Sequence, residues 1–174
     1  MTQPPRHHAA THAEQMLAFA GEHAAELAAP GLSPRPARKV AVLACMDTRI
    51  DLYAMLGLRR GDAHIVRNAG GLVTDDAIRS LSISQRLLGT EEIVVVMHHG
   101  CGLLGASEDE FARALAADGA APQWRLGAFA DVQEALRAGL ARLRAAPELV
   151  SRERIRGFVF DPESGALREL DRGA

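Results

Sequence analysis

Residues 40–49 read Val-Ala-Val-Leu-Ala-Cys-Met-Asp-Thr-Arg, and residues 93–102 read Ile-Val-Val-Val-Met-His-His-Gly-Cys-Gly. Each stretch begins with a short, continuous apolar run, which predicts strands over 40–44 and 93–97 that are buried on both faces. Each run leads directly into residues that can bind a metal or carry a charge. The two stretches therefore predict a parallel sheet with its chemistry gathered at the carboxyl ends of the strands.

The remaining sequence alternates between patterns typical of helices and patterns typical of strands. Helical spacing, capping residues and glycine stops predict helices over residues 13–28, 52–56, 75–88, 107–117 and 131–143. Apolar runs bounded by turn residues predict further strands over residues 64–67, 155–160 and 166–170. This alternation is typical of an α/β fold. We expect a mainly parallel β-sheet flanked by helices on both faces, with a C-terminal antiparallel strand.

Composition limits the classes of partner and the compartment. The chain has 174 residues, 48% of them apolar, and a net charge of -2, which is not the basic surface that nucleic-acid binding requires. Its apolar runs are too short to span a bilayer, and its N-terminus lacks the apolar core of a signal peptide. We therefore expect a cytoplasmic protein with no nucleic-acid or membrane partner. In a reducing compartment, its two cysteines are expected to be metal ligands or reactive thiols rather than a disulfide.

Both cysteines lie in the two opening stretches, together with a histidine. Cys45 follows the first predicted strand, and His98 and Cys101 follow the other with a spacing of three. Two thiolates and one imidazole are three ligands of a tetrahedral zinc site whose fourth position is open to water or a carboxylate. The competing interpretation, two inert buried cysteines, leaves the polar residues beside them without a purpose. We predict a catalytic Zn2+ site held by Cys45, His98 and Cys101.

An acid and a base follow the first cysteine at alternate positions. The guanidinium of Arg49 can hold the carboxylate of Asp47 through two parallel hydrogen bonds and keep it ionised. Beside zinc, Asp47 has two options: it can take the fourth coordination position, or it can accept a hydrogen bond from a zinc-bound hydroxide and orient it. The alternative is a plain surface ion pair, which the position at the end of a buried strand disfavours.

Proline-rich sequence at residues 30–36 divides the chain. We predict that residues 1–36 form an N-terminal arm with one helix and that residues 37–174 form a single zinc-binding α/β domain. The apolar positions between Met16 and Leu27 suit an arm that reaches a second subunit, or else a helix that packs on its own sheet.

The motifs make the chain resemble a β-class carbonic anhydrase of the compact bacterial type. That family is marked by C-x-D-x-R and a later H-x-x-C-G, which match residues 45–49 and 98–102. Residues 67–70 are similar to the family's R-N-A-G segment. The similarity covers roughly residues 39–102, and it implies the α/β fold that the periodicity also predicts.

The resemblance also implies a function and a set of roles. It implies a zinc lyase that reversibly hydrates CO2 to bicarbonate and a proton through attack of a zinc-bound hydroxide. Cys45, His98 and Cys101 are then the zinc ligands, and Asp47 and Arg49 are the catalytic dyad that orients the hydroxide. The N–H of Gly102 lines the substrate pocket. The family implies a homodimer or a dimer of dimers with CO2 and bicarbonate as its small-molecule partners.

Two other functions remain open from the sequence. Enzymes that hydrolyse carbonyl sulfide or carbon disulfide resemble the same family and have the same zinc set, so the motifs do not separate the substrates. A non-catalytic zinc-binding regulator or scaffold is the third possibility. The acid and base of residues 47–49 argue against it, because a purely structural zinc site is closed by a fourth permanent ligand.

Overall fold

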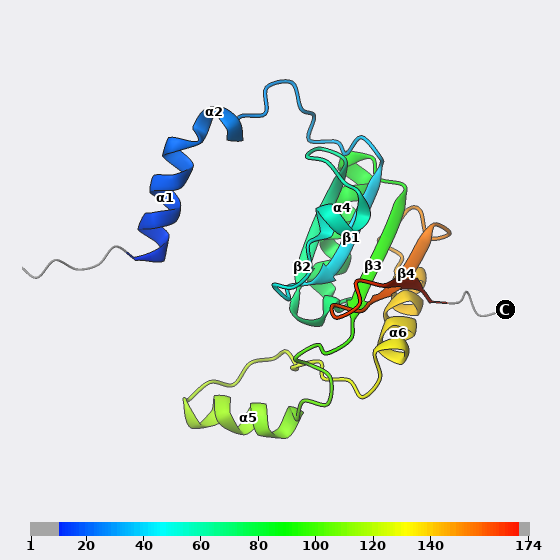
Figure 1. Ribbon diagram of the computed structural model, residues 1–174. Helices are drawn as coiled ribbons and strands as arrows, with labels where there is room; N and C mark the ends of the chain where they lie inside the picture. Colours follow the sequence, from blue (N-terminus) through cyan, green and yellow to red (C-terminus); the bar gives the residue numbers. More distant parts are fainter. Residues whose placement is uncertain (1–10, 171–174) are drawn as a thin grey trace, which may run out of the picture. The chain divides into compact units, whose positions relative to one another are not determined.

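A computed structural model describes residues 11–170 of the chain (Figure 1). The chain consists of two compact units, Met1–Leu32 and Ser33–Ala174. None of the helices within residues 11–170 is long and apolar enough to cross a membrane.

Within residues 11–32, the first unit contains two helices where the sequence predicts one. Helix α1 spans His12–Glu22 and helix α2 spans Ala24–Leu27, so the helix predicted over residues 13–28 is interrupted at His23 (φ -105°, ψ 15°). Gly21 weakens the last turn of α1, because glycine loses the most backbone freedom in a helix. The backbone N–H and the ring Nδ1 of His23 both bond the carbonyl of Phe19, and these bonds close the helix there.

The second unit is built on one mixed sheet. Its strands are β1 (Val40–Cys45), β2 (Ala63–Asn68), β3 (Glu92–His98), β4 (Ile155–Phe160) and β5 (Leu167–Glu169). They lie in the order β2-β1-β3-β4-β5; the first four run parallel, and β5 pairs antiparallel with β4. This architecture confirms the predicted mainly parallel sheet with a C-terminal antiparallel strand.

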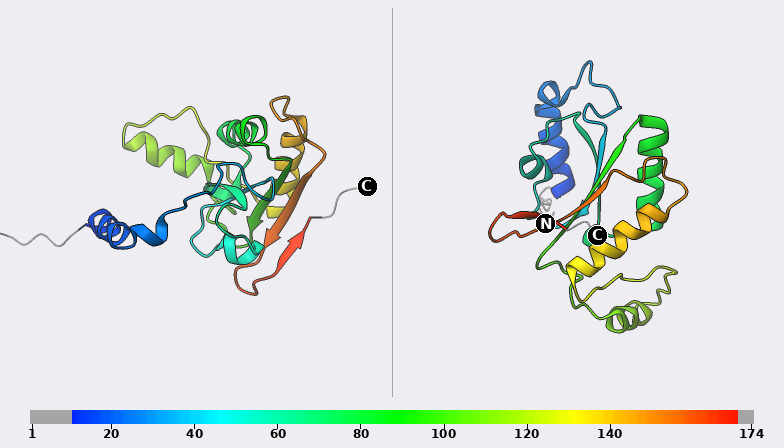
Figure 2. Two further views of the ribbon diagram at one scale, coloured as in Figure 1. Left: turned by 90° about the horizontal axis from the view of Figure 1, so that it is seen from above. Right: turned by 90° about the vertical axis from the view of Figure 1, so that its right-hand side faces the viewer.

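The helices cover the two faces of the sheet unequally (Figure 2). Helices α4 (Asp75–Leu88) and α6 (Val132–Ala145) pack on one face and share a core with alternate residues of β1, β3 and β4. The short helix α3 (Leu52–Leu56) and the loops after β1 and β3 cover the opposite face. Helix α5 (Glu108–Ala117) has no buried residue. The expectation of helices on both faces is correct, but the two long buried helices lie on the same face.

A tight turn connects β2 to the centre of the sheet. Residues Ala69–Gly71 form one 3-10 turn directly after β2, and Gly71 has a left-handed φ of 66°. A Cβ atom at Gly71 would lie 2.9 Å from the backbone nitrogen of Cys45 and 2.9 Å from the carbonyl oxygen of Val96. The turn therefore approaches the ends of β1 and β3 so closely that only glycine fits.

The close approach at Gly71 predicts a measurable loss of stability. We compare Gly71→Ala with Gly89→Ala, because Gly89 also has a positive φ but has open space around its Cβ position. The left-handed conformation alone costs a non-glycine residue about 1–2 kcal/mol, which is the expected loss at Gly89. The added backbone clash at Gly71 should bring its loss to about 3 kcal/mol or more. Equal losses in chemical denaturation would contradict this account.

Candidate metal centre

Three metal-ligating side chains meet at the carboxyl edge of the sheet. Cys45 ends β1, His98 ends the neighbouring strand β3, and Cys101 lies in the loop that follows β3. One possible ligand atom from each residue lies within 4.8 Å of the others. The three residues are 4%, 1% and 6% exposed, respectively. The sequence prediction that these residues come together is therefore supported by the geometry.

The hydrogen bonds of His98 leave one ring nitrogen free for a metal. Its Nδ1 lies 3.0 Å from the carbonyl oxygen of His99. Because a carbonyl only accepts, Nδ1 carries the proton and Nε2 keeps its lone pair. Nε2 is buried and has no hydrogen-bond partner among the described residues. An isolated buried acceptor is costly, and a bound metal ion would satisfy it.

The charge states of the donors also fit a divalent cation. Burial lowers the pKa of His98, so the ring is neutral, as a metal ligand must be. Burial, together with the neighbouring Cys45, raises the pKa of the Cys101 thiol. The Cys101 thiol therefore resists ionisation on its own, whereas a bound cation would deprotonate it outright. The set of two sulfurs and one imidazole nitrogen is one that zinc accepts.

The carboxylate of Asp47 lies beside this cluster in a fixed orientation. The backbone N–H and Nε of Arg49 both donate to Oδ1 of Asp47 at 2.9 Å, and Nη2 of Arg49 donates to Oδ2 at 2.8 Å. These bonds hold the pKa of Asp47 well below its usual range, so the group is ionised at neutral pH. Oδ2 lies 3.8 Å from Nε2 of His98. The predicted pair is therefore formed beside the candidate ligands.

Arg49 also joins the two motif loops. Its Nη2 donates to the carbonyl oxygen of Gly100 at 2.9 Å, across 51 positions of sequence. Gly100 has a φ of 64°, which glycine adopts without strain. The guanidinium thus fixes both the carboxylate of Asp47 and the loop that carries Cys101.

Arg67 supports the site in a way that the sequence analysis did not identify. Its Nε donates to the carbonyl oxygen of Cys45 at 2.9 Å, and its Nη2 donates to the carbonyl oxygen of Asp47 at 2.7 Å. Strand β2, which carries Arg67, pairs with β1 up to Cys45. The sequence shows only a charged residue near the end of a predicted strand. Its contacts with Cys45 and Asp47 arise because β2 lies beside β1, and the sequence does not reveal that order.

Gly102 lies directly after Cys101 in an exposed turn. Its N–H makes no hydrogen bond to any described residue, so this donor is available to a ligand. A hollow of about 370 Å3 lies beside Arg49 and is also lined by His99, Gly100 and the turn residues Asp161–Glu163. The site therefore combines two buried sulfur ligands, one buried imidazole, one oriented carboxylate and a free backbone donor close to solvent.

Comparisons with known proteins agree with this geometry. A family model described as carbonic anhydrase matches residues 40–156. The chain is 46% identical over 136 residues to β-carbonic anhydrase 1 of Mycobacterium tuberculosis, covering 78% of this chain and 83% of that protein. It is 37% identical over 152 residues to a carbon disulfide hydrolase of Acidithiobacillus thiooxidans, with 75% and 76% covered. A crystal structure of carbonic anhydrase from Streptococcus mutans superposes with a TM-score of 0.86 at 36% identity, covering 94% of this chain and all of that one.

The contacts of Asp47 predict the effect of removing its partner. In metal-free, reduced protein, Arg49→Gln should raise the pKa of Asp47 toward the ordinary range, because the guanidinium that stabilises the ionised form is gone. Carboxyl carbon NMR shifts followed against pH would measure the change. The pKa of Glu91, which Lys39 lowers on another part of the surface, should not move and is the internal control. An unchanged Asp47 titration would show that Arg49 does not hold the carboxylate.

Proposed function

The chain belongs to the β-carbonic anhydrase family, and we propose on that basis that it catalyses the reversible hydration of CO2 to bicarbonate and a proton. The observation that carries the proposal is the buried cluster of Cys45, His98 and Cys101 with the ionised carboxylate of Asp47 beside it. The cluster offers a binding site for a metal ion. The carboxylate of Asp47, whose orientation Arg49 fixes, can accept a hydrogen bond beside that ion.

Zinc is the metal that we propose for this site. Cys45, His98 and Cys101 would hold it, since two thiolates and one imidazole are donor types that zinc prefers, and they leave a fourth position open to water. When bound, zinc lowers the pKa of a coordinated water and so makes a nucleophile available near neutral pH.

The chain's own residues would orient the reactants. Asp47, held in its ionised form by Arg49, can only accept hydrogen bonds, so it selects the direction in which a neighbouring O–H group points. The free N–H of Gly102 is a donor for a substrate oxygen that gains negative charge. Arg67 holds the backbone of Cys45 and Asp47, and it therefore acts as a positioning residue.

Carbon disulfide hydrolysis is the second candidate, because the chain is 37% identical to an enzyme of that name. Carbonyl sulfide is a related alternative substrate. The higher identity to a carbonic anhydrase favours CO2. The non-catalytic alternative finds no support, since the family match identifies the chain as an enzyme.

The assembly and compartment stay predictions. The exposed apolar side chains of Met16, Leu17 and Phe19 on α1 are consistent with the homodimer or dimer of dimers that the family implies. Two buried free cysteines within ligand distance of each other are consistent with a reducing cytoplasm.

Metal analysis tests the ligand assignment. Purified protein should contain one zinc ion per chain, and Cys45→Ser or Cys101→Ser should lose most of it, because a hydroxyl is a far poorer zinc ligand than a thiolate. Circular dichroism would show whether each variant stays folded. Full zinc content in both folded variants would exclude these residues as ligands.

Stopped-flow CO2 hydration tests the reaction and the role of Asp47. We expect the zinc-loaded protein to hydrate CO2 faster than it hydrolyses carbonyl sulfide or carbon disulfide, assayed in parallel. Asp47→Asn should keep zinc and lower kcat/KM about 10- to 100-fold, because a neutral amide loses the clamp of Arg49 and can present a donor. Asp76→Asn is the matched control, since Asp76 pairs with Arg79 on the exposed surface of α4. Parent-like turnover by Asp47→Asn would exclude the orienting role.

A further inference from the structure

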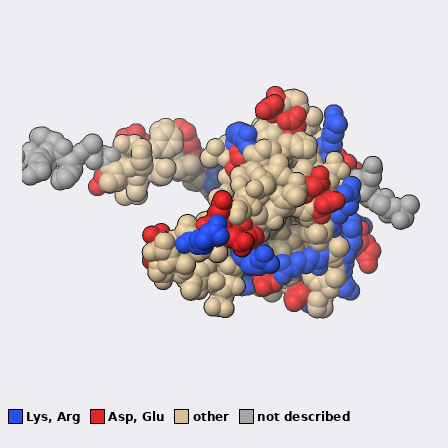
Figure 3. All heavy atoms as spheres, turned by 90° about the horizontal axis from the view of Figure 1, so that it is seen from below, with Lys and Arg blue, Asp and Glu red and all other residues tan. Residues whose placement is uncertain are grey.

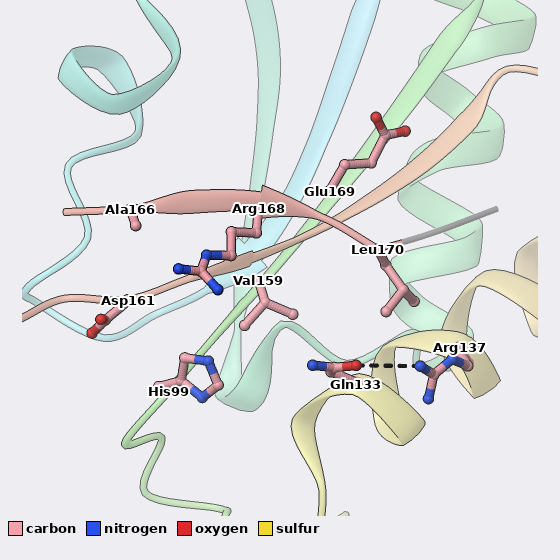
Figure 4. Close-up of a pocket in the computed structure, with 9 residues that line it drawn as sticks. All are labelled: His99, Gln133, Arg137, Val159, Asp161, Ala166, Arg168, Glu169 and Leu170. Atoms are coloured by element: carbon pink, nitrogen blue, oxygen red, sulfur yellow. Dashed lines mark hydrogen bonds between the residues drawn. The ribbon is translucent and has the colours of Figure 1, made fainter. Parts of the chain in front are cut away.

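A second cavity, of about 290 Å3, lies apart from the candidate zinc ligands (Figure 4). It is enclosed by the start of α6, the β4–β5 hairpin and the loop after β3. Buried apolar side chains from Val159 and Leu170 form part of its lining. None of Cys45, His98 or Cys101 lines it. The cavity therefore does not include the candidate ligands, although it shares His99 and Asp161 with the hollow beside Arg49.

Two guanidinium groups face this cavity without a carboxylate partner. Arg137 comes from α6 and Arg168 from β5, and neither forms an ion pair within residues 11–170. Nη2 of Arg137 donates to Oε1 of Gln133 at 3.2 Å. This bond turns the amide nitrogen of Gln133 away from Arg137 and toward the cavity, as Figure 4 shows. Three side chains thus offer N–H donors to the same space.

The acidic residues of the lining are already engaged elsewhere. Oδ1 of Asp161 accepts the N–H of Glu163 at 3.0 Å, and Oδ2 accepts the hydroxyl of Ser164 at 2.6 Å. Glu169 is held by Arg156 through two hydrogen bonds, at 2.9 and 2.7 Å. Its side chain points to the opposite side of β5 from Arg168, as expected for successive strand residues (Figure 4). Other groups therefore satisfy the carboxylate oxygens of both acids, which leaves the guanidinium groups of Arg137 and Arg168 available to a ligand.

We propose that this cavity binds a small organic dicarboxylate. A planar guanidinium recognises a carboxylate through two parallel hydrogen bonds, and the two arginines here offer a place for two such groups. The apolar side chains of Val159 and Leu170 suit a short hydrocarbon body between them. A volume of about 290 Å3 is at the small end of ligand sites, which restricts the ligand to a few carbon atoms.

Arg137 and Arg168 give the cavity two cationic groups, and cationic groups at a site raise the local concentration of anions. Figure 3, which views the molecule from below, shows basic side chains in a row with acidic side chains among and beside them.

The cavity meets the metal centre at His99, which lines both the cavity and the hollow beside Arg49. His99 lies at its edge; the N–H of His99 donates to the carbonyl of Phe160 at 3.0 Å, and its carbonyl accepts from Nδ1 of His98. The proposed ligand would therefore contact neither the metal ligands nor Asp47. The proposal does not depend on which reaction the metal centre catalyses.

Isothermal titration calorimetry on the full, zinc-loaded chain tests the proposal, with succinate as the probe at constant ionic strength. We expect saturable binding of one succinate per chain and none of succinamide, which has the same skeleton without charge. Arg137→Gln and Arg168→Gln should each weaken binding about tenfold, because each removes a charge-assisted contact. Arg152→Gln, which removes an exposed arginine outside the cavity, is the matched control and should change binding less than about twofold.

Three outcomes would overturn the proposal. Parent-like binding by both cavity variants would place succinate elsewhere, including at the zinc. Equal affinity for inorganic phosphate and succinate would remove the organic dicarboxylate as the ligand class. A change of mass in light scattering for the cavity variants, with no succinate binding by the parent, would show that the arginines face a second copy of the chain. Zinc content and circular dichroism of each variant establish that it is folded.

Discussion

The parallel pairing of β1 with β3 is the constraint on which the candidate metal centre depends. Both strands are buried, run side by side and end at the same edge of the sheet, so Cys45 and His98 meet although 53 positions separate them. The loop after β3 then brings Cys101 to the same point. Because the ligand atoms at this edge are buried, leaving them without a partner costs free energy. Nε2 of His98, which is buried and accepts no hydrogen bond from a described residue, is the clearest case. A bound cation offsets that cost, which couples metal binding to the stability of the sheet edge.

The loop after β1 has no regular structure, yet the carboxylate that it carries has a fixed direction. Arg67 bonds two of its carbonyl groups from the β2 side, and Arg49 bonds Asp47 and the carbonyl of Gly100 from the β3 side. Gly71 lets the turn after β2 pack directly under the end of β1. Arg67, Arg49 and Gly71 thus hold the loop where strand hydrogen bonds do not. They fix the direction of the Asp47 carboxylate before any ligand binds.

The sequence predicted the parts of the molecule that depend on local periodicity and on residue chemistry. The strand and helix cores, the cluster of Cys45, His98 and Cys101, and the pairing of Asp47 with Arg49 all follow from spacing and donor type. The sequence missed features that depend on three-dimensional placement. It did not indicate that α4 and α6 lie on one face, nor that Arg67 on β2 donates to carbonyl groups at the end of β1 and in the loop after it. The break at His23 came from a competing local bond to Phe19, which apolar spacing does not reveal.

The residues that define the family cannot be the ones that choose among its substrates. The chain is similar both to a carbonic anhydrase and to a carbon disulfide hydrolase, and both comparisons cover about three quarters of it. We therefore expect selectivity to come from side chains other than the candidate metal ligands. The hollow beside Arg49 is lined partly by residues 161–163, in the turn between β4 and β5, and the family match ends at residue 156. This turn follows the last parallel strand and carries none of the candidate metal ligands. The hollow beside Arg49 is therefore the place where we expect side chains to affect the choice of substrate.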